Sequence, residues 1–563
     1  MWLSCLIVFV SSACALVIEL IAGRMMAPYV GVSLYTWTSI IGVVLAGMSA
    51  GNFLGGIVAD RYASRAVLGS IFVAGSVSSL GILVSIHWVT AANIPLSLLP
   101  RIVFYTTAAF FLPSLVLGMV SPVVVKLTLA DLERAGNTVG TIYAVSTIGS
   151  IFGTFLTGFW LISWLGTRNI VWIVAGVLLL MGIAVGRFYR STSERVALAI
   201  AGVVAAAVLW RGTEGVPPGL LLDTGGPRTM LLWLVVLGAV LLLAGALLSA
   251  FVRTCAVGLA VVAFALTRLA WNAGEYRAPC QLESDYYCIR ILETTNPNGH
   301  AARTLMLDHL VHSYVDLDDP TALDYGYERA YADLTQSHAV GRPPIDTLFI
   351  GGGGYAFPRY VEATYPGASV DVIEIDPAVI EVAHRELGLP PTSRIRSFNR
   401  DARMFLTEWS DPKQYDVIYG DAFNDLSVPY HLTTVEFNRI VASRLKPDGL
   451  YLANVIDRLE GGEFLKAYAN SLRAVFPYVY IFARSDALLP FDRNTYVLMA
   501  SRQPLERDQL DSVTSTELPD VQTAAMPDAR LNSYLTSGRA LTLTDDFAPV
   551  DQLLASLFIE RGQ

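Results

Sequence analysis

Four consecutive glycines, Gly351–Gly354, end an apolar run in the second half of this 563-residue chain. A stretch of helical length follows them, and a second apolar run then ends at Glu374. Glycines at such a position let the backbone turn tightly and approach a ligand closely, and an acidic residue about 20 positions further on can bind ribose hydroxyls. The spacing therefore predicts the first strand–helix–strand unit of a nucleotide-binding sheet.

The glycine loop differs from the dinucleotide fingerprint, because Tyr355 and Phe357 stand where a pyrophosphate-binding loop has small residues. A glycine loop with an acidic second strand end, but without a helix start suited to phosphate, indicates a nucleoside that has no phosphates. S-adenosylmethionine and its decarboxylated form are the usual ligands of this kind.

Two further carboxylates follow apolar runs, at Asp401 and Asp421. Asp401 stands before a helical pattern, where a helix cap is the alternative role. Asp421 ends YDVIYGD (415–421), and no helical pattern begins until about Thr433, so a cap explains it less well. Because ligands of a doubly wound sheet bind at the carboxyl ends of its strands, we expect these carboxylates, Glu374 and the glycine loop to converge on one crevice.

Alternating strand and helix patterns around these residues predict a doubly wound parallel sheet. A small β-hairpin subdomain is expected before it, within 282–316. Strands are expected at 346–351, 370–374, 395–398, 415–420, 449–454, 477–483 and 494–499, and helices at 321–338, 356–364, 377–386, 402–408, 433–444 and 461–474.

Composition divides the chain into two halves. Hydrophobic residues make up 53% of the chain and charged residues 15%, and the apolar residues gather in the first half. Residues 1–271 contain fourteen Lys/Arg and seven Asp/Glu, a net charge of +7, which leaves −16 for residues 272–563 of a chain whose net charge is −9. A basic, apolar half followed by an acidic half indicates a membrane domain joined to a soluble domain. The acidic soluble half argues against nucleic acid as a partner.

The membrane half contains apolar stretches at roughly 2–22, 34–58, 66–88, 103–125, 138–163, 169–186, 196–210, 229–251 and 254–271. Basic residues follow the second, fourth and sixth stretches, which places the N-terminus in the cytosol. Nine crossings would put the acidic half outside the cell, where adenosyl donors are not expected. Since 196–210 has only fifteen residues and a span needs about 20, we favour eight crossings, with nine as the alternative. A multi-pass protein of the cell inner (plasma) membrane, embedded in the lipid bilayer with a cytosolic soluble domain, is expected.

The second apolar stretch presents Gly47, Gly51 and Gly55 at four-residue spacing, which predicts a smooth face for close helix packing. It runs into GGIVADRYASR (55–65), which resembles the cytosolic loop motif of major facilitator transporters. Glu19 is an ionisable residue within an apolar helix, so it marks either a functional site or a polar pair that orients two helices.

Cys280 and Cys288 flank a short segment at the start of the soluble half. They would pair if this domain faced an oxidising compartment, and two free buried thiols is the favoured alternative. The seven histidines of the chain show no metal-ligand spacing, so no metal site is expected.

Taken together, these motifs resemble the spermidine synthase (polyamine aminopropyltransferase) family, and more narrowly its membrane-bound bacterial members, in which transmembrane helices precede the synthase domain. The resemblance covers roughly residues 280–555. It lies in ESDYYCIRI (283–291), LMLDHLVHSYVD (305–316), DYGYERAY (324–331), IGGGG (350–354), VIEIDPAVIEVA (372–383), DAR (401–403), YDVIYGDAFND (415–425) and LTDDFAPVD (543–551). Jointly these segments are specific, whereas singly several are shared with any S-adenosylmethionine-dependent methyltransferase.

The resemblance implies an α-helical multi-span membrane domain over 1–271, a small β-hairpin subdomain over 280–320, and a nucleoside-binding domain over 321–563. The last would be an α/β Rossmann-like domain of the S-adenosylmethionine-dependent methyltransferase type. The implied reaction transfers the aminopropyl group of decarboxylated S-adenosylmethionine to a polyamine acceptor such as putrescine, giving spermidine or a related polyamine and methylthioadenosine. The donor is a co-substrate, and no cofactor is expected to be bound permanently.

Site residues follow from the resemblance position by position. Asp421 would hold the attacking amine and help to remove its proton, Tyr327 would lie near that amine, and Asp425 would be a second carboxylate in the gate loop. The expected donor-binding residues are Gly351, Gly352, Gly353, Glu374 for the ribose, Asp401 with Ala402 for the adenine edge, and His312. The expected partner is a small-molecule amine, and a homodimer is compatible with the sequence.

Three positions depart from the family pattern. The family's loop reads GGGDG, and its aspartate, which faces the aminopropyl ammonium, is replaced here by Gly354; family glutamines are replaced by Tyr287 and His312. The nucleoside half of the site is therefore kept, while the half that recognises the charged tail of the donor is altered. Either Asp545 or another carboxylate compensates, or the donor or the reaction differs.

Two alternatives to aminopropyl transfer follow. One is an S-adenosylmethionine-dependent methyltransferase acting on a membrane-delivered substrate, which the missing loop aspartate favours. The other is a transporter or sensor whose synthase-like domain binds its ligand without turnover, which Glu19, the glycine face and the facilitator-like loop favour.

Overall fold

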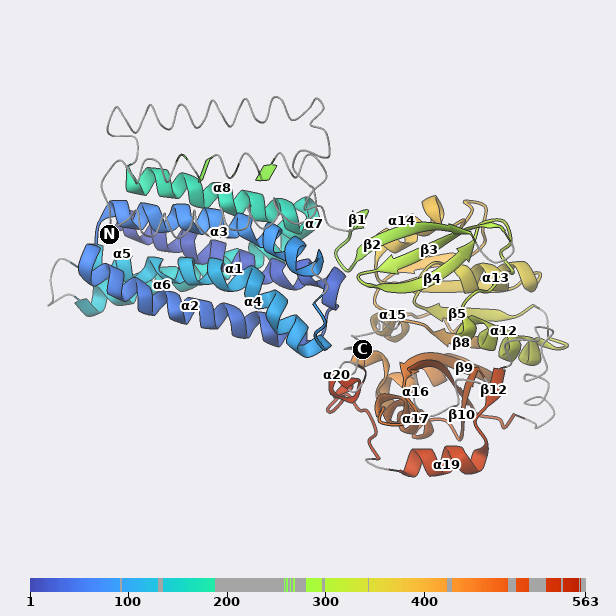
Figure 1. Ribbon diagram of the computed structural model, residues 1–563. Coiled ribbons are helices and arrows are strands. Elements are labelled where there is room, and N and C mark those ends of the chain that lie inside the picture. Colours follow the sequence, from blue (N-terminus) through green and yellow to red (C-terminus); the bar gives the residue numbers. More distant parts are fainter. Residues whose placement is uncertain are drawn as a thin grey trace. The chain divides into compact units, whose positions relative to one another are not determined.

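The computed structural model describes most of the chain. The described residues are 1–187 apart from 92–93 and 130–134, isolated positions between 258 and 268, and 280–557 apart from 296–298, 343, 423–427, 485–492, 506–522, 538–539 and 556. Its chain divides into two compact units, Met1–Pro279 and Cys280–Gln563 (Figure 1).

Among the described residues of the first unit, six helical segments are long and apolar enough to cross a membrane. They are α1 (Trp2–Val30), α2 (Leu34–Tyr62), α3 (Arg65–Ala91), α4 (Leu98–Gly118) continued by α5 (Val120–Thr128), α6 (Ala135–Leu156) continued by the π-helical turn η1 (Thr157–Leu161) and α7 (Ile162–Leu165), and α8 (Thr167–Gly186). The first six predicted apolar stretches are thus confirmed as helices. The predicted stretches 196–210 and 229–251, and most of 254–271, lie outside the described residues, as does the choice between eight and nine crossings.

The predicted glycine face of α2 packs closely against α4. Gly47, Gly51 and Gly55 are all buried. A β-carbon at Gly51 would overlap the carbonyl oxygen of Leu115 in α4, and one at Gly55 would come within 2.7 Å of the Cα of Met119. The two backbones therefore meet without intervening side chains, which is the close packing that small residues permit in membrane helices.

Gly51→Ala is expected to destabilise the helical unit, because the added methyl group overlaps the α4 backbone and overpacking of this kind costs roughly 1–3 kcal/mol. The thermal midpoint of the detergent-solubilised protein should fall. Gly56→Ala is the matched control on the same helix, since its β-carbon would meet no atom within 4 Å. Equal thermal midpoints for the two variants would contradict the close packing of α2 against α4.

The second unit begins with a small antiparallel sheet. Among the described residues it contains β1 (Leu282–Glu283), β2 (Cys288–Thr295), β3 (Ala301–Leu307) and β4 (Leu310–Asp316), paired in sequence order. Buried side chains of this sheet, such as Leu305, pack with Val379 and Val382 of α14 (Pro377–Glu386). The predicted β-hairpin subdomain is present and is docked on a helix of the larger domain.

The two cysteines at its start form a disulfide, Cys280–Cys288, so the favoured prediction of free thiols is wrong. The reason lies in local pairing that the spacing did not reveal. Glu283 of β1 pairs with Cys288 of β2, and the N–H of Gln281 donates to the carbonyl of Ile289 at 2.9 Å. This tight turn brings the two Cα atoms to 5.1 Å, within the range that a disulfide requires.

The larger sheet contains eight strands among the described residues, in the order β12-β10-β11-β9-β8-β5-β6-β7. They are β5 (Asp346–Ile350), β6 (Ser369–Glu374), β7 (Arg396–Asn399), β8 (Tyr415–Gly420), β9 (Leu445–Asp457), β10 (Tyr478–Arg484), β11 (Asn494–Ser501) and β12 (Thr523–Ala525). The helices are α12 (Gly326–Ala339), α13 (Ala356–Thr364), α14, α15 (Ala402–Glu408), α16 (Val435–Arg444), α17 (Phe464–Arg473), α19 (Asp528–Thr536) and α20 (Val550–Leu553), with a short 3-10 turn η2 (Tyr430–Leu432).

The sheet is mixed, and the prediction of a wholly parallel sheet is corrected at one end. β7, β6, β5, β8 and β9 are parallel, whereas β11 is antiparallel to both β9 and β10. Parallel neighbours need a crossover of a dozen or more residues, and only residues 485–493 separate β10 from β11, so this pair forms a hairpin. The Rossmann-like methyltransferase fold class itself is confirmed.

An aromatic core holds β5 and β8 side by side. The rings of Phe349 and Tyr419 stack with centroids 4.3 Å apart, and Phe357 of α13 and Tyr331 of α12 meet Tyr419 at 5.2 Å. All four side chains are buried, and full burial of each such side chain stabilises by about 1.5–3 kcal/mol. This core lies beneath the point where the two strands end.

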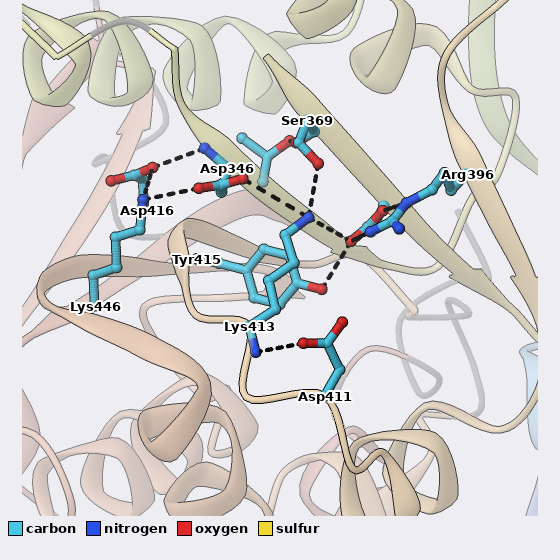
Figure 2. Close-up of polar contacts among 10 residues, drawn as sticks. Asp346, Ser369, Arg396, Asp411, Lys413, Tyr415, Asp416 and Lys446 are labelled. Atoms are coloured by element: carbon cyan, nitrogen blue, oxygen red, sulfur yellow. Dashed lines mark hydrogen bonds and ion pairs between the residues drawn. The ribbon is translucent and has the colours of Figure 1, made fainter. Parts of the chain in front are cut away.

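A network of charges fastens the opposite, amino-terminal ends of the parallel strands (Figure 2). The buried carboxylate of Asp371 in β6 accepts both guanidinium bonds of Arg396, at 2.6 and 2.7 Å, the ammonium of Lys413 at 2.9 Å and the hydroxyl of Tyr415 at 2.9 Å. Burial alone would raise the pKa of Asp371, but these bonds outweigh it and hold the pKa below its usual value. Nearby, Lys446 donates to two further aspartates, Asp346 and Asp416, at 2.9 and 2.8 Å.

Asp371→Asn is expected to lower the free energy of unfolding of the second unit by about 2–3 kcal/mol, because Arg396 and Lys413 lose the charge that pairs them. Thermal unfolding should show a midpoint lower by roughly 5–10 °C. Because folding lowers the pKa of this carboxyl, it stabilises the folded state above its unfolded-state pKa of about 4 and loses that effect at lower pH. The difference in stability between the variant and the wild type should therefore shrink below about pH 4. Glu381→Gln, in an exposed pair with Arg385, is the control and should change stability by less than about 0.5 kcal/mol.

Candidate active site

The glycine loop turns sharply at the end of β5. Gly351 and Gly353 have positive φ angles of 98° and 49°. A β-carbon at Gly351 would lie 2.5 Å from the carbonyl oxygen of Asp421, whose own N–H donates to Ile350 at 2.8 Å. The glycine is therefore required where the ends of β5 and β8 meet, and the same contact brings Asp421 to the loop.

Glu374 ends β6 with its carboxylate buried against the loop. Its two oxygens accept the backbone N–H groups of Gly352 at 2.8 Å and of Asp376 at 2.9 Å. Burial raises the pKa of Glu374, while these backbone bonds act in the opposite direction. The side chain thus holds the glycine loop in place and also lines the pocket.

Asp401 is both a helix cap and a pocket residue. One carboxylate oxygen accepts the N–H of Met404 at 2.9 Å, which caps α15, and the other lies 3.1 Å from Nε2 of His431. Asp401 and the neighbouring Ala402 also line the pocket. The two roles considered for this aspartate from the sequence are therefore compatible.

Asp421 follows β8 and is held by two donors. The hydroxyl of Tyr327 donates to Oδ2 at 2.9 Å, and Nδ2 of Asn454 donates to Oδ1 at 2.9 Å. Burial raises the pKa of Asp421 to about 6, although both hydrogen bonds oppose the shift. Burial also raises the pKa of Tyr327 well above its usual value, with a further contribution from the charge of Asp421, so this hydroxyl remains a donor at neutral pH. The carboxylate is poised to accept a proton or bind a cation near neutrality.

These residues meet around one open pocket. Its lining comprises Tyr287, Leu307, His312, Gly351, Gly353, Ile373, Glu374, Ile375, Arg400, Asp401, Ala402, Asp421, Ala422, Pro429, His431 and Leu432. Seven of the ten residues predicted for the site are thus brought to one place. Of the other three, Gly352 and Tyr327 bind lining carboxylates through their N–H and hydroxyl, and Asp425 lies outside the described residues.

Sequence reasoning missed two polar residues of the site. Asn454 stands in the apolar strand segment YLANVID (451–457), and a lone amide in a buried strand was the signal that marked it. His431 lies 3.1 Å from Asp401 through its Nε2 and also lines the pocket. No sequence pattern linked either residue to its carboxylate partner.

The departure at Gly354 has a steric counterpart. A β-carbon there would lie 2.6 Å from both Cβ and Oγ of Ser313 in β4, so the small sheet occupies the space that a longer side chain needs. Asp545 does not offer a free carboxylate in its place, because it pairs with Arg403 and accepts the hydroxyl of Thr434 at 2.8 Å. The idea that Asp545 compensates for Gly354 is therefore not supported.

One group of potential metal ligands occurs among the described residues. His300, Asp316 and Asp318 place ligand-type atoms within 4.8 Å of one another. Oδ1 of Asp316 already accepts the backbone N–H groups of Asp318 and Asp319, both at 2.8 Å. None of these residues lines the pocket.

Part of the second unit is similar to known proteins. Residues 333–491 match the family described as spermine/spermidine synthase domain. A polyamine aminopropyltransferase of Vibrio vulnificus is 28% identical over 231 residues, which are 40% of this chain and 75% of that protein. A probable polyamine aminopropyl transferase of Bifidobacterium longum is 26% identical over 28% of this chain and 34% of its own length. The human eEF1A lysine and N-terminal methyltransferase is 28% identical over 24% of this chain and 21% of its own length.

Among solved structures, a probable spermidine synthase from Corynebacterium glutamicum is 21% identical, covers 48% of this chain and 99% of its own, and superposes with a TM-score of 0.42.

The second unit therefore contains a spermine/spermidine synthase domain, and by enzyme class the protein is a transferase. Ahead of that domain, among the described residues, stand the six helices whose length and composition suit a membrane.

Tyr327→Phe should raise the titration midpoint of Asp421 above about 6, because the carboxylate loses one of its two donors. A lost hydrogen bond to a charged group corresponds to about one pH unit. Infrared difference spectroscopy of the carboxyl group across pH 4–9 measures the shift, with Asp421→Asn identifying the band. Tyr331→Phe, in the same helix, is the control, since that hydroxyl lies 3.4 Å from the carbonyls of Gly420 and Leu452 and does not bond Asp421. An unshifted midpoint in Tyr327→Phe would contradict the hydrogen bond from Tyr327 to Asp421.

Proposed function

We propose that the protein transfers the aminopropyl group of decarboxylated S-adenosylmethionine to a polyamine acceptor such as putrescine, giving spermidine or a related polyamine and methylthioadenosine. The observation that supports this best is the buried Asp421 carboxylate. It accepts hydrogen bonds from Tyr327 and Asn454, and it lines the same pocket as the glycine loop. The relatives named polyamine aminopropyltransferases add to it.

In this proposal, the donor's nucleoside lies between the glycine loop and the β6 and β7 strand ends. Gly351, Gly352 and Gly353 form the turn beneath it. Glu374 faces the ribose hydroxyls, and Asp401 with the backbone of Ala402 faces the adenine edge. His312 lies on the wall supplied by the small sheet.

The reaction is an in-line displacement. The lone pair of a neutral amine forms a carbon–nitrogen bond at the carbon beside the sulfonium, and the carbon–sulfur bond breaks, with its electron pair returning to sulfur as the thioether of methylthioadenosine. The new ammonium then loses a proton, which Asp421 is placed to accept because its pKa is about 6. Tyr327 keeps the carboxylate oriented. We assign Asp425 the role of a second carboxylate, which screens the positive charges of the donor and of the acceptor from each other.

We further propose that the apolar helices cross the inner membrane in eight passes and keep the synthase domain in the cytosol, where the donor is made. The lipid bilayer and a small amine are then the two partners of the chain.

Methyl transfer from S-adenosylmethionine is the second candidate. It is favoured by the contact of Gly354 with Ser313, which leaves no room for a loop carboxylate, and by the relatives named eEF1A lysine and N-terminal methyltransferase.

The test is methylthioadenosine release by the full-length, detergent-solubilised protein given decarboxylated S-adenosylmethionine and a panel of amines. Release should depend on the amine, rise with pH through about 6 as Asp421 loses its proton, and fall by about 10²–10⁴-fold in Asp421→Asn. Asp528→Asn, at an exposed position of α19, is the control and should leave the rate unchanged.

Failure to release methylthioadenosine with every amine, together with formation of S-adenosylhomocysteine from S-adenosylmethionine, would replace aminopropyl transfer by methyl transfer.

A further inference from the structure

Glu328, in the first turn of α12, is a buried acid to which the reaction above gives no role. Only 3% of its surface is exposed. Its carboxyl group receives a backbone hydrogen bond from Tyr325, the residue that precedes the helix. Its Oε2 is buried and has no hydrogen-bond partner among the described residues. A buried oxygen without a partner costs stability, so its presence calls for an explanation in function.

Glu328 lies close enough to Asp421 to feel its charge. Burial raises the pKa of Glu328 well above its usual value, and the negative charge of Asp421 is the next contribution in the same direction. The guanidinium of Arg329 opposes the shift more weakly, and its Nε donates to the carbonyl of Leu323 at 2.8 Å. Two acids are thus held near each other under burial, which is an arrangement that a bound cation would stabilise.

Asn454 adds a second unpartnered acceptor beside Asp421. Its Nδ2 donates to Oδ1 of Asp421 at 2.9 Å, whereas its own Oδ1 is buried and has no partner in the part of the chain that the structure describes. Glu374 and Asp401 differ, because both oxygens of each already have partners within the protein. The acceptors that remain for a ligand therefore lie on the Asp421 side of the site.

Negative charge and unpaired acceptors together suit a primary ammonium group. An ammonium has three donors and no acceptor, and its hydrogen bonds to a carboxylate are among the strong ones. Tyrosine rings at the start of α12 favour a cation as well, because ring faces attract ammonium groups. The ring centroid of Tyr325 lies 5.2 Å from that of Tyr327 and 5.1 Å from that of Tyr314.

We propose that Glu328, together with the carboxylate of Asp421 and the amide oxygen of Asn454, binds a primary ammonium group of a substrate. This inference rests on the proposed aminopropyl transfer. Both substrates of that reaction carry such a group, the donor at the end of its aminopropyl chain and a diamine acceptor at the end that does not attack. The bound ammonium favours the ionised form of both acids, and Glu328 fixes the position of that substrate relative to Asp421.

The test is calorimetric binding of three ligands to the full-length, detergent-solubilised protein. Decarboxylated S-adenosylmethionine and putrescine each carry a primary ammonium, whereas methylthioadenosine carries none. Glu328→Gln should weaken at least one of the two ammonium ligands by roughly 10- to 100-fold and leave methylthioadenosine unchanged. The ligand that weakens identifies the substrate whose ammonium is bound. Glutamine has nearly the same shape and can still accept the N–H of Tyr325, so the helix start should be kept.

Asp333→Asn is the matched control. Asp333 is a partly buried acid of the same helix, which bonds Thr523 and whose pKa burial raises to about 6. This variant should bind all three ligands as the wild type does.

Unchanged binding of both ammonium ligands to Glu328→Gln would overturn the inference. An equal loss of all three ligands would assign Glu328 a structural role and overturn it too. Failure of the wild type to bind either nucleoside would instead count against the proposed function, and the putrescine measurement would still decide whether Glu328 binds an ammonium.

Discussion

The backbone contact between Gly351 and Asp421 is the constraint on which the site depends. It exists because β5 and β8 are neighbours in the sheet and end at the same level, with Ile350 paired to Gly420. No side chain fits between them, so the turn of the glycine loop and the position of the aspartate are set together. The aromatic stack of Phe349 and Tyr419 directly below fixes the two strands at this spacing. Glu374 then holds the loop from the β6 side through the N–H of Gly352. The glycine loop and the Asp421 carboxylate are thus parts of one rigid arrangement.

Burial gives that arrangement its chemistry. A solvated aspartate with a pKa near 4 would be a poor proton acceptor, whereas Asp421, buried beneath two donors, titrates near 6. The same two donors also fix the direction in which its oxygens point. The low polarity that raises the pKa therefore requires the hydrogen bonds that partly lower it, since an unpaired buried carboxylate would destabilise the fold.

Much of this was readable from the sequence, because strand–helix alternation and glycine spacing report on backbone geometry directly. The helices α13, α14 and α15 have the predicted bounds, and the carboxylates at the ends of the strands converge as expected. Features that depend on side-chain contacts between distant segments were not readable. Asn454 lies 33 positions from Asp421 in sequence, and nothing in either local pattern marks the pair. The reversed direction of β11 and the Cys280–Cys288 bond each follow from a short connection whose conformation the composition did not specify. Asp425 lies outside the described residues.

The charge network around Asp371 has a consequence for how such a domain can change over evolutionary time. Asp371, Lys413, Arg396 and Tyr415 meet toward the amino-terminal ends of the parallel strands, whereas the pocket lies at the carboxyl-terminal ends. Stability and selectivity are thus encoded at opposite rims of one sheet. Exchanges at the pocket, such as glycine for aspartate in the loop or aromatic residues for glutamines on the wall, therefore leave this charge network untouched. A lineage can explore new donors or acceptors on one rim while the other keeps it folded.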